Sequence, residues 1–159
     1  MRESSPGARV EKICGRQYFS ASSAAGQIIA VSPAAFNRAA AIADVFQFYR
    51  FTKLNIEVKP SSATLSIGYA NGAAFDTPPS SSGEVLQLPF AKLMVPTQSV
   101  PERISVPRSE LVKDSQLTWY KTIAGTPDAQ FEVQGNIYLG ASGSTSTILV
   151  IEYEVEFQS

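Results

Sequence analysis

Few residues in this chain of 159 are of the types that carry out catalysis or bind a metal. Histidine is absent, which removes the commonest general base and the commonest metal ligand. The single cysteine, Cys14, excludes an intrachain disulfide and is typical of a reducing compartment. Asp114 and Asp128 could form the carboxylate pair of a glycosidase, but each lies in a turn-like segment where aspartate is ordinary turn chemistry. We therefore expect that the protein is not an enzyme.

Three glutamates, Glu152, Glu154 and Glu156, alternate with apolar residues near the C-terminus. Side chains two residues apart on a strand are separated by about 6.5 Å and need not converge on one ion. We interpret them as the solvent-facing side of a strand over 149–157, whose other side is buried.

Composition favours one β-rich domain. Hydrophobic residues make up 44% of the chain, enough for one core, and charged residues make up only 17%. The formal net charge of −1 gives the folded domain no general attraction for phosphate. We expect a flexible N-terminal arm over 1–9 and a folded domain over 10–159. No apolar stretch is long enough to cross a bilayer, so we expect no membrane association.

Apolar and polar residues alternate along most of the folded domain, which is typical of half-buried strands. Together with 149–157, strands are predicted over 10–22, 26–31, 54–60, 63–69, 99–106, 117–122 and 130–139. The short turn between 54–60 and 63–69 predicts that these two strands form a hairpin. Two sheets packed face to face would bury so many one-sided strands.

Helical patterns occur in two places. Ser32 and Pro33 precede an alanine-rich segment with Phe36 at helical spacing, which predicts a helix over 33–45. A second short helix is predicted within 83–93, where Pro89 limits its length.

Four strings of residues follow one another in a recognisable order. A proline-started helix leads into FQFYRF at 46–51, and a strand ending at Pro60 precedes a glycine-containing strand. A VPR string at 106–108 precedes Trp119, and two alternating strands close the chain. Together they resemble the shell domain of small positive-strand RNA virus coat proteins of the sobemovirus and tombusvirus type, over about residues 15–157.

The resemblance implies an all-β fold, an eight-stranded antiparallel jelly-roll sandwich with one or two short helices. It also implies a capsid protein that self-assembles into an icosahedral shell enclosing the genome, located in the virion and in the host cytoplasm during assembly. The main partner is then the protein itself.

Two features depart from the family pattern. The family carries a long basic arm that neutralises RNA, whereas here the basic residues that could contact RNA near the N-terminus are Arg2, Arg9, Lys12 and Arg16. The family also often has two calcium-binding aspartates in the loop after its fourth strand, where this chain offers only Asp76. Since calcium takes six to eight oxygen ligands, we expect weak or no calcium dependence and no other cofactor.

A jelly roll also serves unrelated functions, so a ligand-binding module of lectin-like or cytokine-like type is the alternative. Such a module needs a pocket, to which Trp119 and Tyr120 could contribute. A tryptophan on a core strand is more often simply buried.

Overall fold

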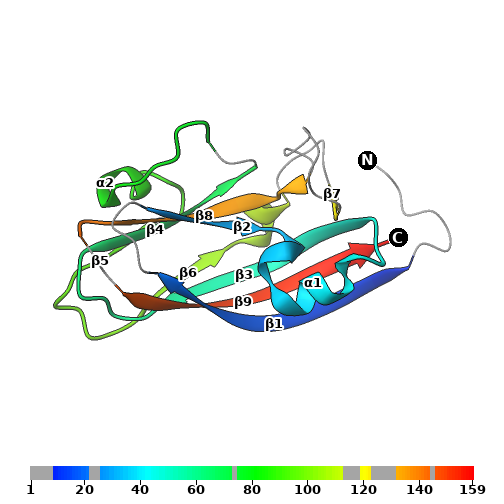
Figure 1. Cartoon of the computed structure of the whole chain (residues 1–159), viewed down its shortest axis with the longest axis horizontal. Coiled ribbons are helices and arrows are strands. Elements are labelled where there is room, and N and C mark those ends of the chain that lie inside the picture. Colours follow the sequence, from blue (N-terminus) through cyan, green and yellow to red (C-terminus); the bar gives the residue numbers. More distant parts are fainter. Residues whose placement is uncertain (1–8, 22–25, 73–74, 113–118, 123–131, 144–145) are drawn as a thin grey trace.

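The computed structural model describes residues 9–21, 26–72, 75–112, 119–122, 132–143 and 146–159, which form two β-sheets packed face to face (Figure 1). The first sheet contains, in spatial order, β1 (Val10–Ala21), β9 (Thr147–Gln158), β3 (Phe48–Val58) and β6 (Glu102–Val106), with the two-residue β7 (Tyr120–Lys121) also paired to β3. The second sheet contains β2 (Gln27–Val31), β8 (Gly135–Ala141), β4 (Leu65–Asn71) and β5 (Lys92–Met94).

The chain passes from one sheet to the other at most of its connections, and β4 and β5 are neighbours that stay in the same sheet. All strand pairs of the described residues are antiparallel. This alternation between two four-stranded layers is the topology of a jelly roll. The predicted eight-stranded jelly-roll sandwich is confirmed, with β7 as a short addition.

The predicted hairpin of 54–60 with 63–69 is wrong. The two segments lie in β3 and β4, which belong to different sheets. The connection between them crosses the sandwich, since the Lys59 amide donates to the Ile148 carbonyl and the Thr64 carbonyl accepts from the Ser142 amide. Alternation shows that each strand has one buried face, but it does not show which strand is its neighbour.

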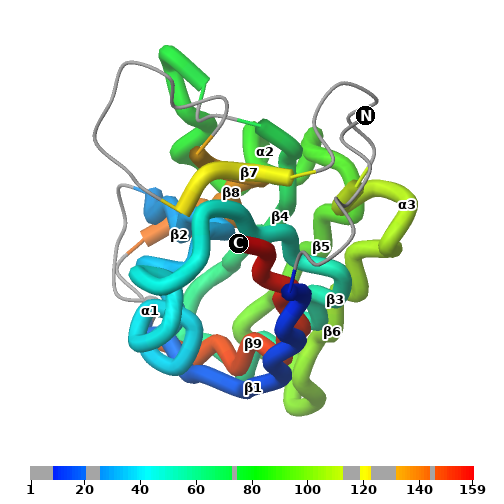
Figure 2. The backbone as a smooth tube through the Cα atoms, turned by 90° about the vertical axis from the view of Figure 1, so that its right-hand side faces the viewer, coloured from blue at the N-terminus to red at the C-terminus, as the bar shows by residue number. Residues whose placement is uncertain are grey.

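The predicted helix over 33–45 is split in two. A single 3-10 turn, Pro33–Ala35, is followed by α1 (Asn37–Ala43), and Phe36 between them has an extended backbone. The Phe36 ring is fully buried, with its centroid 4.5 Å from that of Tyr153 and 5.3 Å from that of Phe51. Insertion of this ring into the core explains the break. Helix α1 covers the open side of the sandwich between edge strands β1 and β2 (Figure 2).

Two four-residue helices accompany α1. Helix α2 (Ser82–Val85) lies at the start of the predicted 83–93 segment, and a capping box between Ser81 and Glu84 begins it. Helix α3 (Arg108–Leu111) was not predicted from the sequence. Strand β6 lies between Pro101 and Pro107 at the edge of its sheet, as expected for a strand flanked by prolines.

Strand β8 is buried on both faces, so the prediction of a half-buried strand over 130–139 is wrong within the described residues. Its outward face is covered from two sides. Gly140 lies so close to the loop before α2 that an added Cβ would be 2.5 Å from the Ser81 carbonyl oxygen. Phe75 stacks on Tyr138 with ring centroids 5.5 Å apart. The covering segments are distant in sequence, and strand periodicity carries no information about them.

Strand β1 runs without interruption through Gly15. Gly15 faces the phenol ring of Tyr153, and an added Cβ would be 2.7 Å from its hydroxyl oxygen. The glycine is therefore needed for close packing of a neighbouring ring. Among the described residues, no helix has the length and apolar composition that crossing a bilayer requires.

The close packing of Gly135 against Tyr69 predicts a stability effect. A Cβ at Gly135 would clash with the buried phenol ring of Tyr69, and overpacking of this kind costs about 1–3 kcal/mol. We expect Gly135→Ala to lower the free energy of unfolding by that amount in urea denaturation. Gly143→Ala is the matched control, because among the described residues no atom beyond its chain neighbours lies within 4 Å of its added Cβ. Equal stability of the two variants would contradict the packing described here.

Candidate functional site

The outer face of the five-stranded sheet carries a ladder of charges centred on β9. Ile151, Tyr153 and Val155 point into the core, so the alternate residues Glu152, Glu154 and Glu156 point outward. Strand β9 pairs with β1 along one edge and with β3 along the other. The glutamates therefore lie between cations supplied by both neighbouring strands.

Glu152 and Glu154 each have one partner on β1 and another on β3. Glu152 pairs with Arg16 of β1 at 3.2 Å and with Lys53 of β3. Glu154 pairs with Lys12 of β1 at 3.1 Å and accepts a 2.8 Å hydrogen bond from the Thr52 hydroxyl of β3. These contacts tie three strands together on the side of the sheet that faces away from the core.

The third glutamate, Glu156, forms the least exposed ion pair of the ladder. Its carboxylate accepts a 2.7 Å hydrogen bond from Arg50, and the two side chains are 12% and 20% exposed. The Arg50 guanidinium also lies over the Trp119 ring, 4.2 Å from its centroid. Low exposure and the cation–π contact make this pair less screened by water than the others.

A β-bulge in β3 places Thr52 and Lys53 beside the glutamates. The register with β9 shifts between Phe51 and Lys53. Phe51 and Leu54 are three residues apart and both belong to the core, whereas residues three apart on an unbroken strand point to opposite faces. The extra residue lets Thr52 contact Glu154 and Lys53 contact Glu152.

The ion pairs favour the charged form of the carboxyls. Lys53, with a smaller contribution from Arg16, holds the pKa of Glu152 below its usual value. The Thr52 hydroxyl and Lys12 do the same for the pKa of Glu154. Further along the sheet, Lys59 and Arg103 lower the pKa of Glu57. The face thus stays a network of opposite charges at neutral pH.

One end of this face is hollowed into a depression of about 360 Å³. It spans all four main strands of the sheet and is lined mainly by polar and charged residues, together with Val150. Ile56 and Ile104 also border it, but their side chains are buried in the core. Its charged lining residues are Arg16, Glu57, Lys59, Arg103 and Glu152.

The family model described as viral coat protein (S domain) matches residues 15–159. The chain belongs to the viral coat protein family. No curated protein sequence matches the chain significantly.

Solved viral structures show the same fold as this coat protein. The structure of Mud crab tombus-like virus matches with a TM-score of 0.73 and 14% identity, covering 100% of this chain and 84% of that chain. Tobacco necrosis virus matches with a TM-score of 0.71 and 15% identity, covering 94% and 95%. Cocksfoot mottle virus matches with a TM-score of 0.65 and 14% identity, covering 95% and 81%. The family resemblance inferred from the four sequence strings is confirmed.

The four basic residues expected to contact RNA do not form one group in the coat protein. Lys12 and Arg16 lie on β1 and are paired with Glu154 and Glu152. Arg9 pairs with Glu11, and Arg2 lies outside the described residues. At least three of the four side chains therefore already contact a carboxylate within the subunit.

The remaining candidate residues do not form a catalytic or metal centre in the described part of the chain. Asp76 is exposed, and no group of three potential metal-ligating residues occurs among the described residues. Asp114 and Asp128 lie outside those residues. Tyr120 is buried with its ring 5.9 Å from that of Tyr49, so it packs in the core.

The cations on or next to β3 and β6 that pair with glutamates were not predicted from the sequence. No role was predicted for Arg50, Lys53, Lys59 or Arg103. The usable signal was the three-residue spacing of Phe51 and Leu54, which indicates a bulge. It could have placed Lys53 on the same face as Arg50.

The lowered carboxyl pKa values predict acid sensitivity of the isolated subunit. A carboxyl whose pKa is lower in the folded than in the unfolded state stabilises the fold above the unfolded value of about 4.3, and this contribution is lost as pH falls through the folded value. We expect the free energy of unfolding to decrease from about pH 5 downward. In urea denaturation, Glu152→Gln/Glu154→Gln should flatten this decrease, whereas Lys92→Gln on the other sheet should not. Equal slopes of unfolding free energy against pH for the wild type and both variants would show that the ladder does not contribute to acid sensitivity.

The Arg50–Glu156 pair predicts a larger coupling than an exposed pair. In a double-mutant cycle with Arg50→Gln and Glu156→Gln, we expect a coupling energy of about 1–3 kcal/mol, because each variant leaves a poorly hydrated charge unpaired. The matched control is Arg9 with Glu11, whose side chains are 74% and 39% exposed. Its coupling should be below about 0.5 kcal/mol. A coupling for Arg50 and Glu156 no larger than this control would contradict the assignment.

Proposed function

We propose that this coat protein is the shell-forming subunit of a small icosahedral virus and that its domain tiles copies of itself into a closed particle around nucleic acid. The family match over residues 15–159 carries this proposal. The jelly-roll topology of the described residues supports it. The role is structural, so it depends on the shape and surface of the subunit and not on a reaction centre.

Exposed apolar side chains support self-association. Several large hydrophobic residues remain open to solvent on the single subunit, including Val45, Phe75, Leu93, Val100 and Ile148. Burying such side chains between copies contributes favourable free energy, and closed symmetry lets the same few contacts repeat around the particle. Modest contacts at each copy are enough when many copies close one shell.

Genome contact is proposed to use the N-terminal arm together with the sheet face. Arg2 and Arg9 lie at or before the start of the folded domain, whereas Lys12 and Arg16 form part of the ion-pair ladder. So few contacts hold RNA weakly in a monomer, but their repetition around one enclosed polymer raises the effective affinity.

Assembly in the host cytoplasm is proposed as the route to the virion. The one cysteine, Cys14, is free and exposed, which agrees with a reducing compartment. We further propose that assembly does not require calcium, because Asp76 would need several more oxygen ligands from elsewhere.

The decisive experiment is electron microscopy and gel filtration of the purified full chain. We expect closed particles of dozens of copies, with an absorbance ratio at 260 and 280 nm that shows bound nucleic acid, and no disassembly in a calcium chelator. Val155→Asp places a charge in the core and should yield no particles, as a negative control. A stable monomer or small oligomer that binds a glycan would favour the lectin-like alternative instead.

Particles of Arg2→Ser/Arg9→Ser test the arm separately. These substitutions leave the ion pairs of Lys12 and Arg16 intact. Nucleic acid content equal to that of the wild type would show that the arm does not package the genome.

A further inference from the structure

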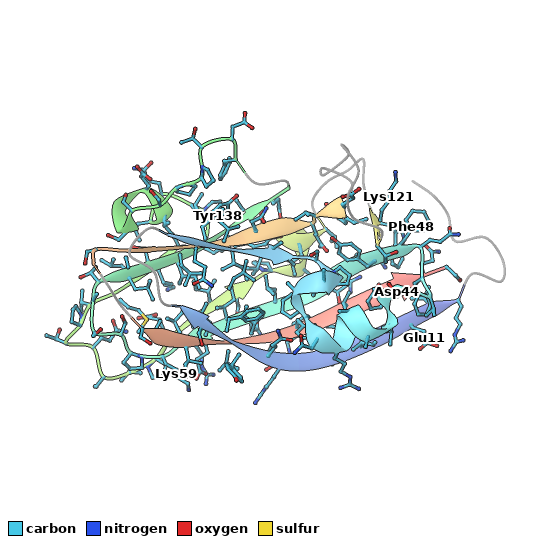
Figure 3. All side chains as sticks on the ribbon, in the orientation of Figure 1. Glu11, Asp44, Phe48, Lys59, Lys121 and Tyr138 are labelled. Atoms are coloured by element: carbon cyan, nitrogen blue, oxygen red, sulfur yellow. The ribbon has the colours of Figure 1, made fainter. Side chains whose placement is uncertain are left out.

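The depression on the outer face of the five-stranded sheet is built from cross-strand neighbours. One row of direct partners runs from Arg16 through Glu152 and Asn55 to Ser105, across β1, β9, β3 and β6. The next row runs from Tyr18 through Val150 and Glu57 to Arg103. Lys59, which follows β3, completes the lining at the end of the sheet where Figure 3 labels it.

The charges around this depression do not balance. Arg16 and Lys53 share Glu152, and Lys59 and Arg103 share Glu57. Three cations, Arg16, Lys59 and Arg103, thus line the depression with two carboxylates, which leaves an excess of one positive charge. Lys53 adds a further cation beside the depression. Further along the face, Lys12 pairs with Glu154 and Arg50 with Glu156, so each of these two cations has its own carboxylate.

The excess positive charge is at the rim and accessible. Arg16 and Arg103 have side chains that are 73% and 79% exposed, whereas Glu152 and Glu57 are only 33% and 22% exposed. A ligand approaching the face therefore meets the guanidinium groups before the carboxylates. Each of these planar groups keeps donors available for a phosphate while it contacts its glutamate.

An exposed aromatic ring stands beside the same depression. Tyr18 is 70% exposed and is the direct cross-strand partner of Val150, which lines the depression. An aromatic ring open to solvent on a sheet face, next to a cationic groove, is the combination that binds single-stranded nucleic acid: bases stack on the ring while cations hold the backbone.

We propose that this depression, with Arg16, Lys59 and Arg103 at its rim and Tyr18 beside it, binds the phosphates of a single-stranded nucleic acid and stacks one of its bases. The inference rests on the proposed function, because it requires this sheet face to lie on the inside of the particle, next to the nucleic acid. It differs from arm binding because every residue belongs to the folded domain. An acidic segment of a second copy would also neutralise the excess charge, but it would leave the exposed ring of Tyr18 without a role.

The test measures binding of fluorescein-labelled decauridylate to the full chain by fluorescence anisotropy over a range of salt concentrations. Lys59→Gln/Arg103→Gln should weaken binding and make the slope of log affinity against log salt less steep by about 1.4, since each lost contact to a single strand accounts for about 0.7. Lys92→Gln, a cation on the opposite sheet, is the matched control and should leave the slope unchanged.

Two variants of Tyr18 test whether binding needs an aromatic ring or only an apolar side chain of similar size. Tyr18→Leu should weaken binding at least about fivefold, and Tyr18→Phe should retain wild-type affinity, because stacking needs the ring and not the hydroxyl. The high exposure of Tyr18 means that neither variant should unfold the subunit, which circular dichroism checks.

The outcomes separate this inference from the proposed function. If wild-type particles contain nucleic acid but none of these variants changes decauridylate affinity, the depression is not a binding site and packaging lies elsewhere. If Lys59→Gln/Arg103→Gln abolishes particle assembly while its affinity for decauridylate equals that of the wild type, the face is a contact between copies and the inference is overturned. Particles without nucleic acid, together with a subunit that does not bind decauridylate, would contradict both.

Discussion

Strand β9 is paired along both edges, with β1 from Val10 to Ala21 and with β3 from Phe48 to Val58, and most of the structure depends on this position. Its inward side chains, among them Ile151, Tyr153 and Val155, form the centre of the core. Its outward glutamates would repel one another if the neighbouring strands were neutral. The cations of β1 and β3 therefore remove the repulsion that would keep the acidic strand β9 from the centre of the sheet. Burial of its apolar side chains then favours this central position.

This arrangement explains how a domain with few charges can present a polar sheet face without a strong net field. Most cations on the face contact a carboxylate, in agreement with the formal net charge of −1 for the whole chain. A subunit that must lie beside many identical copies benefits from this balance, because a large net charge of one sign would oppose assembly. The local excess around the depression is the exception, and its position is set by two glutamates that each serve two cations.

The second sheet differs from the first in how its outer face is covered. Its central strand β8 is buried on both faces, beneath the segment around α2 and beneath Phe75. The two sheets thus differ in character, since one carries charges on its outer face and the other is covered by its own connecting segments. A jelly-roll subunit of this kind therefore offers two unlike outer surfaces.

Much of the fold could be predicted from sequence because strand faces and helix starts depend on residues close together in the chain. Alternation correctly assigned Leu149, Ile151, Tyr153, Val155 and Phe157 to the core, and Pro33 correctly marked the start of the helical segment. The order of four short strings was enough to indicate the coat protein family. Strand partners, the break at Phe36 and the pairing of Glu152 with Arg16 were decided only in the tertiary structure. Residues 136 positions apart meet there, and a period of two along a strand states which face a side chain occupies but not which strand lies beside it.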